Sequence, residues 1–200
     1  MKILITGSSG FIGFHLSKLF LSKGHKVYGI DSMNSYYDVK LKRKRLNILK
    51  KYENFSFTKI NIENEKKLNI IFKKFRPKVV VHLAAQAGVR YSIRKPRVYL
   101  GSNINGSFNI IEASHKTNVK HLIMASSSSV YGANKKIPFK ETDKAETQLS
   151  IYAATKKANE SMAHSYSNIW NIPITMLRFF TVYGPWGRPD MALFKFTKGV

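Results

Sequence analysis

Cysteine is absent from this 200-residue sequence, which excludes disulfides and thiolate-bound metals from the fold and from the chemistry. The six histidines show no paired spacing of the kind that binds metals, so we expect no metal site. No basic and apolar leader precedes the first predicted strand, and no apolar run approaches membrane-spanning length. We therefore expect a cytoplasmic protein without a membrane partner.

Acidic residues are scarce: 11 Asp and Glu stand against 34 Lys and Arg, for a net charge of +23. Such a balance is compatible with nucleic-acid binding, because clustered cations bind phosphates. The cations are spread along predicted helix faces, however, and the one dense run extends from Lys40 to Arg45. We interpret this run as a solvated basic face, and a nucleic-acid surface is the less favoured alternative.

A glycine-rich stretch near the N-terminus is the most informative part of the chain. Residues 3–6 predict a buried strand, which Gly7, Gly10 and Gly13 follow with G-x-x-G-x-x-G spacing, and an amphipathic helix then runs to Gly24. A glycine turn between strand and helix lets backbone N–H groups approach a pyrophosphate at the positive helix N-terminus. The pattern favours a dinucleotide site over a plain tight turn.

A second predicted strand, at residues 26–30, ends at Asp31, which lies 18 residues beyond Gly13. A dinucleotide-binding fold places at this point the acid that binds the adenosine ribose hydroxyls. Because a carboxylate repels a 2′-phosphate, Asp31 predicts NAD in preference to NADP. An ordinary strand-end turn residue is the alternative.

Strands and helices alternate along the rest of the chain. Further strands are predicted at residues 55–60, 79–83, 121–125 and 174–178, and helices at residues 41–49, 64–75, 97–117 and 151–170. Such alternation predicts an α/β fold, a doubly wound parallel sheet of the Rossmann type. With 44% hydrophobic residues, the chain is long enough for one such domain.

Three side chains predict acid–base chemistry. Tyr152 and Lys156 have the i, i+4 spacing that places a phenol and an ammonium on one helix face, and Ser127 belongs to a serine-rich strand exit. A Lys ammonium and a bound nicotinamide cation would favour the phenolate, so that Tyr152 could take a hydroxyl proton while Ser127 holds the same oxygen. An amphipathic pair and a polar loop are the structural alternatives.

These motifs together resemble the extended short-chain dehydrogenase/reductase family, the NAD-dependent epimerases and dehydratases that remodel nucleotide-sugars. Within that family, three longer strings, at residues 34–38, 82–92 and 178–192, are similar to UDP-glucuronate 4-epimerases. The resemblance covers essentially the whole chain. It implies NAD as cofactor, a UDP-sugar as substrate, and epimerisation at carbon 4 through a transient 4-keto sugar, most closely from UDP-glucuronate to UDP-galacturonate.

The resemblance also implies roles for individual residues. The catalytic residues would be Ser127, Tyr152 and Lys156. The cofactor-binding residues would be Gly7, Gly10, Phe11, Ile12, Gly13, Asp31, Ser32, Asn34, Asn61, Ile62, Leu83, Ala84, Ala85, Gln86, Asn103, Tyr152 and Lys156. The substrate-binding residues would be Arg90, Ser127, Ser128, Tyr152, Thr181 and Arg188, with Thr181 and the two arginines reading a sugar carboxylate; surface arginines are the alternative.

The sequence departs from the family pattern at several places. Asn61 stands where Asp is usual, which predicts a weakened adenine contact, and Ser128-Ser129 replace the Asp-Glu pair of dehydratases. Because the chain ends at Val200, we expect a NAD-binding domain at residues 1–185 and only the start of a smaller substrate-binding portion at residues 186–200. Another epimerase, dehydratase or decarboxylase of the family, or a catalytically silent NAD- or nucleic-acid-binding fragment, are the alternatives.

A homodimer is also expected from the resemblance. Members of the family pair two helices from each copy in a four-helix arrangement, which here implies the helices at residues 97–117 and 151–170.

Overall fold

A single parallel β-sheet organises the computed structural model, which describes residues 1–199. Its strands are β1 (Lys2–Thr6), β2 (Lys26–Asp31), β3 (Phe55–Lys59), β4 (Val79–His82), β5 (His121–Ala125) and β6 (Ile174–Leu177). They lie side by side in the order β3-β2-β1-β4-β5-β6, and every pair is parallel. This is the doubly wound Rossmann order, so the predicted fold class is confirmed.

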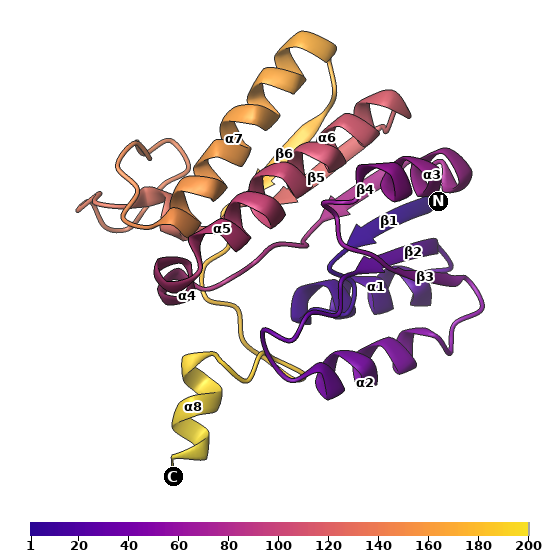
Figure 1. Ribbon diagram of the computed structural model, residues 1–200, viewed down its shortest axis with the longest axis horizontal. Helices are drawn as coiled ribbons and strands as arrows, with labels where there is room; N and C mark the ends of the chain where they lie inside the picture. Colours follow the sequence, from indigo (N-terminus) through magenta and orange to yellow (C-terminus); the bar gives the residue numbers. More distant parts are fainter. Residues whose placement is uncertain (200) are drawn as a thin grey trace.

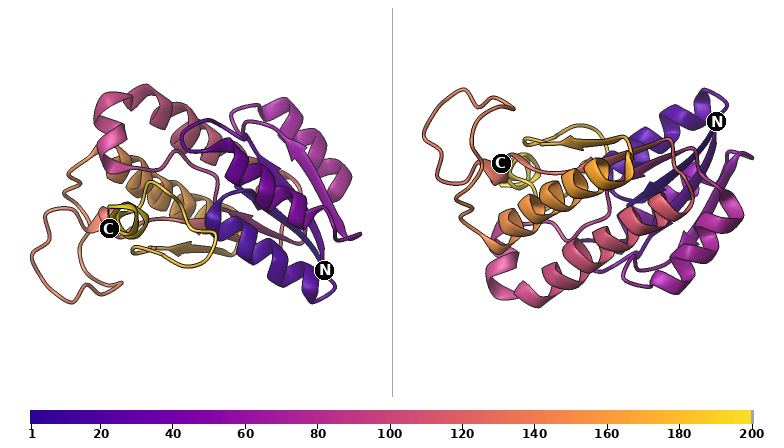
Figure 2. Two further views of the ribbon diagram at one scale, coloured as in Figure 1. Left: turned by 90° about the horizontal axis from the view of Figure 1, so that it is seen from below. Right: turned by 90° about the horizontal axis from the view of Figure 1, so that it is seen from above.

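Helices cover both faces of the sheet (Figures 1 and 2). They are α1 (Phe11–Ser22), α2 (Val39–Leu49), α3 (Glu65–Phe75), α4 (Val89–Arg94), α5 (Pro96–Tyr99), α6 (Gly106–Lys116), α7 (Ile151–Trp170) and α8 (Ala192–Lys198). In Figure 1, α1 and α2 lie below the sheet, α6 and α7 lie above it, and α8 extends away from the sheet. Within residues 1–199, none of these helices is both long and apolar enough to cross a membrane.

Two hydrophobic cores lie between these layers. Leu4 and Val80 point to the side of α3, α6 and α7, where they pack with Phe72 and Ile110. The next residues along the strands point to the opposite side, where Val81 packs against α1 and α2. Strand residues that are buried on both faces explain the continuous apolar runs in the sequence.

The prediction of one continuous helix at residues 97–117 is wrong. The segment consists of α5, a π-helical turn at Leu100–Asn105, and α6, and it is preceded by the unpredicted α4. Close packing accompanies the wide turn: a Cβ on Gly101 would lie 2.7 Å from the Glu63 carboxylate, and one on Gly106 would lie 2.6 Å from Ile62. The other predicted elements agree with the structure to within a few residues.

Helix α7 brings Tyr152 into a defined place. Its N-cap, Ser150, accepts a hydrogen bond from the Ala153 N–H at 3.1 Å, and the helix ends at Asn171 in the left-handed conformation. Because the cap fixes the first turn, Tyr152 has a set direction relative to the sheet.

Candidate functional site

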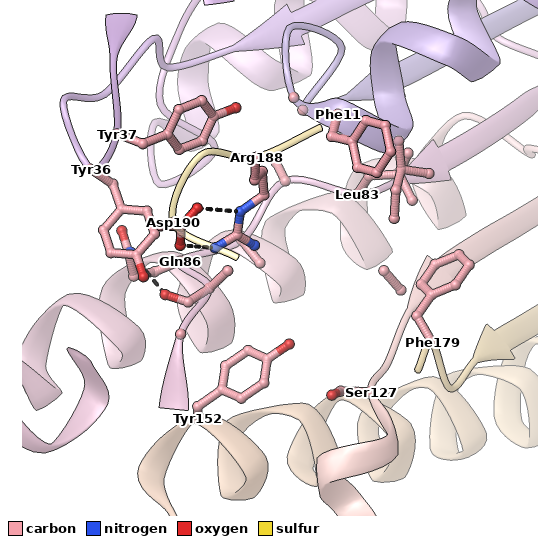
Figure 3. A pocket seen from close by; sticks show the side chains of 18 of the residues that line it. Phe11, Tyr36, Tyr37, Leu83, Gln86, Ser127, Tyr152, Phe179, Arg188 and Asp190 are labelled. Atoms are coloured by element: carbon pink, nitrogen blue, oxygen red, sulfur yellow. Dashed lines mark hydrogen bonds and ion pairs between the residues drawn. The ribbon is translucent and has the colours of Figure 1, made fainter. Parts of the chain in front are cut away.

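A cavity of about 860 Å³ opens at the carboxyl ends of the strands. It lies over the junction of β1 and β4, where the strand order reverses, which is where doubly wound sheets bind ligands. Residues from position 7 to position 196 line it, so it joins segments from nearly the whole chain. Figure 3 shows Ser127 and Tyr152 on one side of this cavity and Arg188 and Asp190 on another.

The glycine turn forms one wall. Gly7 has a φ of +73°, and a Cβ there would lie 2.9 Å from the Ala84 nitrogen. A Cβ on Gly13 would lie 2.1 Å from the Gly7 carbonyl oxygen, so only glycine lets α1 start this close to β1. Within the described residues, no side chain caps α1 at Gly10 and no acid lies in its first turn, which leaves the helix N-terminus suited to an anion.

Asp31 lies at the end of β2 and lines the cavity, although it is buried. One carboxylate oxygen accepts the Ser9 N–H at 3.1 Å and the other accepts the Met33 N–H at 2.8 Å. The carboxylate is therefore held against the glycine turn, where it can also accept hydroxyl groups of a ligand.

Most of the other predicted cofactor residues also line the cavity. These are Gly10, Phe11, Ile12, Ser32, Asn34, Asn61, Ile62, Leu83, Ala84, Ala85 and Gln86. The amide of Asn61 is engaged locally, because its oxygen accepts the Glu63 N–H at 3.2 Å and its nitrogen donates to the Glu63 carboxylate at 3.1 Å.

Asn103 differs from the expectation of direct ligand contact, because it does not line the cavity. Its buried amide accepts the Gln86 N–H at 2.7 Å and donates to the Gln86 carbonyl at 3.1 Å and to the Thr155 hydroxyl at 3.1 Å. The π-helical turn places it behind the β4 exit. Asn103 therefore supports the wall of the cavity and does not form its surface.

Ser127, Tyr152 and Lys156 line the wall of the cavity that β5 and α7 provide. The Lys156 ammonium is buried and donates to the Ala125 carbonyl at 2.7 Å. Burial lowers the pKa of Lys156 from 10.5 to about 8. The Ser127 hydroxyl accepts the Ser129 N–H at 3.2 Å, which holds its oxygen at the end of β5.

The pKa of Tyr152 is set by burial and by two neighbouring groups. Burial raises the pKa of its phenol, and the Ser127 hydroxyl and the Arg188 charge act in the lowering direction. In this structure Ser127 and Arg188 therefore favour the Tyr152 phenolate, whereas burial opposes it.

A partly buried ion pair supports this wall from behind. Glu160, one turn after Lys156 on α7, accepts two hydrogen bonds from the Arg178 guanidinium at 2.9 Å each and one from the Ser126 hydroxyl at 2.6 Å. The pair joins α7 to the ends of β5 and β6, and so fixes the residue next to Ser127.

The predicted substrate residues Arg90, Ser128, Thr181 and Arg188 all line the cavity, but they do not present two free arginines. Arg90 is exposed, whereas the Arg188 guanidinium forms a bidentate pair with Asp190 at 3.1 and 2.5 Å. Asp190 therefore occupies the Nε and one terminal nitrogen of the Arg188 guanidinium, and a second carboxylate would bind through the remaining N–H donors.

Several cavity residues were missed from the sequence. They include Tyr36, Tyr37, Lys42, Phe179 and Asp190. The interpretation of the basic run as a wholly solvated face is also wrong, because Lys42 is buried and donates to both oxygens of Asn34 at 2.7 and 2.8 Å. Helical spacing could have found it, since Lys42 shares a face with the buried Leu46 and Leu49.

The residues that the structure describes contain no cluster of three or more potential metal ligands. His82 is packed inside the sheet, where it bonds the hydroxyls of Thr6 at 2.7 Å and Ser107 at 2.9 Å, and burial lowers its pKa to about 3.

Known proteins resemble this chain over its whole length. The family described as "NAD dependent epimerase/dehydratase family" matches residues 3–199. Protein CapI of Staphylococcus aureus is 60% identical over 200 residues, and a probable UDP-glucuronate 4-epimerase of Rhizobium meliloti is 50% identical over 200 residues. Both comparisons include all of this chain and cover 60% and 59% of those proteins.

A solved structure with the same fold is the UDP-glucuronic acid 4-epimerase of Bacillus cereus in complex with UDP-glucuronic acid and NAD. It matches with a TM-score of 0.90 and 38% identity, over 97% of this chain and 61% of that chain. The chain thus spans about three fifths of the length of the relatives that it matches.

Proposed function

This chain belongs to the NAD dependent epimerase/dehydratase family. We propose that it binds NAD and is part of an NAD-dependent nucleotide-sugar 4-epimerase. The observation that carries the proposal is the cavity itself. It joins the glycine turn and Asp31 to Ser127, Tyr152 and Lys156, which come from opposite halves of the sheet.

The residues of the cavity fit NAD. The uncapped start of α1 suits a pyrophosphate, and the Asp31 carboxylate suits ribose hydroxyls and disfavours a 2′-phosphate. The Lys156 ammonium has three N–H donors and gives one to Ala125, so two donors are available for a ligand. We propose that these groups, with the wall from Leu83 to Gln86, hold the cofactor.

The chain's own residues then supply the acid–base chemistry. Ser127 holds the 4-hydroxyl oxygen of the sugar, and the phenolate form of Tyr152 takes the proton of that hydroxyl. NAD, when bound, supplies the reversible hydride acceptor at the adjoining carbon. Lys156 orients the ribose and adds positive charge, and Tyr152 returns the proton when the keto sugar is reduced from its other face.

For the substrate we propose UDP-glucuronate, with UDP-galacturonate as product. Support comes from the names of the related proteins and from Arg188, Thr181 and Arg90, which line the cavity and can bind a sugar carboxylate. Ser128 and Ser129 also line the cavity, and neither offers a carboxyl group for the elimination step of a dehydratase.

A second candidate is an epimerase for a nucleotide-sugar that lacks a carboxylate. The Arg188–Asp190 pair favours it, because that pair already neutralises the guanidinium. Asp190→Asn separates the two candidates. If Arg188 reads a carboxylate, the variant should bind UDP-glucuronate more tightly than the wild type while its affinity for UDP-glucose is unchanged; equal changes for both ligands in calorimetry would favour the second candidate.

We further propose that residues 1–185 form the NAD-binding domain, that residues 186–200 belong to the substrate-binding portion, and that the protein forms a homodimer. Large apolar side chains are exposed along α5 to α7, namely Val98, Leu100, Phe108, Ile151, Ile169 and Trp170. These side chains suit the pairing of α5–α6 and α7 with the same helices of a second copy.

The experiment that tests the activity is incubation of the purified chain with NAD and UDP-glucuronate, followed by chromatographic separation of the nucleotide-sugars. A UDP-galacturonate peak that Tyr152→Phe abolishes would support the epimerase. NAD binding by calorimetry is measured in parallel, so that loss of turnover with intact NAD binding is distinguished from loss of the cofactor site.

A further inference from the structure

A buried arginine lies behind the cavity, outside the groups that the proposed chemistry uses. Arg45 on α2 is 0% exposed, although it belongs to the most basic run of the sequence. It shares its helix face with Leu46 and Leu49, so the packing of α2 against the sheet carries the guanidinium inward.

The guanidinium joins three segments that are far apart in the sequence. One terminal nitrogen donates to the Ser9 carbonyl at 3.1 Å and to the Tyr37 hydroxyl at 2.8 Å. The other donates to the Trp186 carbonyl and to the Gly187 carbonyl at 3.1 Å. Ser9 belongs to the glycine turn, and Gly187 immediately precedes Arg188.

Each of these acceptors is an uncharged oxygen, so no opposite charge offsets the desolvation of the guanidinium, and the arrangement adds little to stability. A buried charge loses its hydration, and apolar replacements are often as stable as buried ionic groups. What a planar guanidinium adds is geometry, because its fork fixes several acceptors in one plane. Its charge also acts on Tyr37, whose pKa burial raises and Arg45 lowers.

The segment that Arg45 holds also contacts Tyr36, whose ring centroid lies 5.8 Å from the Arg188 guanidinium, and the start of α1. His15 bonds the Pro185 carbonyl at 2.8 Å, and the Trp186 ring packs against Phe14 with centroids 5.8 Å apart. The Arg188 charge in turn acts on Tyr152. A path of direct contacts therefore runs from the glycine turn through Arg45 to the segment that carries Arg188.

We propose that Arg45 is a positioning residue that couples the nucleotide-binding turn to the segment at residues 184–191. Through its fork, a ligand that orders the glycine turn also orders the segment that carries Arg188 and Asp190. The identity of the ligand, NAD, rests on the proposed function, whereas the coupling rests on the hydrogen bonds of Arg45.

Hydrogen–deuterium exchange of the 200-residue chain, with and without saturating NAD, tests the proposal. The variants are Arg45→Met and, as the matched control, Arg43→Met, which removes an exposed arginine from the same helix. Without NAD, Arg45→Met should raise exchange in residues 184–191 by about fivefold, the effect of losing about one net hydrogen bond, and Arg43→Met should not.

With NAD, exchange should slow in residues 7–13 and in residues 184–191 of the wild type and of Arg43→Met, but only in residues 7–13 of Arg45→Met. A merely structural role would leave the NAD response of residues 184–191 intact in Arg45→Met, and that result overturns the proposal. If Arg45→Met does not fold, Arg45→Lys keeps the charge, removes the fork and should show the same loss of response.

The wild type alone separates this proposal from the proposed function. NAD protection of residues 7–13 without protection of residues 184–191 overturns the coupling and leaves the cofactor site standing. NAD without effect on either segment overturns both.

Discussion

Replacing Lys156 by methionine should stabilise the folded chain at neutral pH although it removes a residue proposed for catalysis. Its ammonium is buried, and burial lowers its pKa from 10.5 to about 8. At neutral pH the folded state must therefore hold a charge that the unfolded chain keeps in water.

The size of the effect follows from proton linkage. At about 1.4 kcal/mol for each pKa unit, the lowered pKa corresponds to a cost of about 3 kcal/mol. The variant also leaves the Ala125 carbonyl without its 2.7 Å partner, which costs about 1 kcal/mol. The net expectation is a gain of about 2 kcal/mol in the free energy of unfolding for Lys156→Met.

The pH dependence gives the sign check. Between pH 8 and pH 10.5 the unfolded chain binds the Lys156 proton and the folded chain does not, so wild-type stability rises with pH relative to the variant. The advantage of Lys156→Met is full below about pH 8 and disappears, then reverses slightly, toward pH 10.5.

Urea denaturation of both proteins across this range measures the difference, in which the other titrating groups cancel. The control is Lys157→Met, whose side chain is 34% exposed and 3.6 Å from Glu160, and which should change stability by less than about 1 kcal/mol. A destabilised Lys156→Met at neutral pH, or a difference that does not vary with pH, would refute the reasoning.

Three further outcomes are expected. Gly13→Ala should lower the free energy of unfolding by about 3 kcal/mol in urea denaturation, because its Cβ would lie 2.1 Å from the Gly7 carbonyl oxygen; a loss below about 1 kcal/mol would contradict the packing. Glu160→Gln should lower the free energy of unfolding by about 2 kcal/mol. Burial raises the pKa of Glu160, but hydrogen bonds from Arg178 and Ser126 lower it overall. The stability difference between wild type and variant should therefore vanish in acid denaturation as the pH falls below 4.5. Asp31→Ser should reduce the preference for NAD over NADP by about tenfold in calorimetry, and an unchanged preference would remove Asp31 from cofactor selection.

The fold was predictable from local patterns, because each strand and helix has its own signal and the parallel order follows from their alternation. The π-helical turn at Leu100–Asn105 was not, since it accompanies close packing against Glu63 and Ile62, which lie about forty residues earlier. Helix propensity alone does not contain such a contact.

For the site, motifs located many of the residues that line the cavity but not the bonds among them. The pairing of Arg188 with Asp190 depends on a loop conformation, and the inward direction of Lys42 and Arg45 depends on how α2 packs. The position of Asn103 was likewise not predictable from the sequence. It lies behind Gln86 because of the π-helical turn and not because of its neighbours in sequence.

The hydrogen bonds of Arg45 also have a consequence for the time at which the fold is completed. Its most distant acceptors are made 141 and 142 residues after it. At ribosomal speeds of about 5 to 20 residues per second, roughly 7 to 28 s pass between the synthesis of Arg45 and the synthesis of these acceptors. During synthesis the glycine turn and α2 are therefore made long before the segment around Trp186 and Gly187, which completes the hydrogen bonds of Arg45.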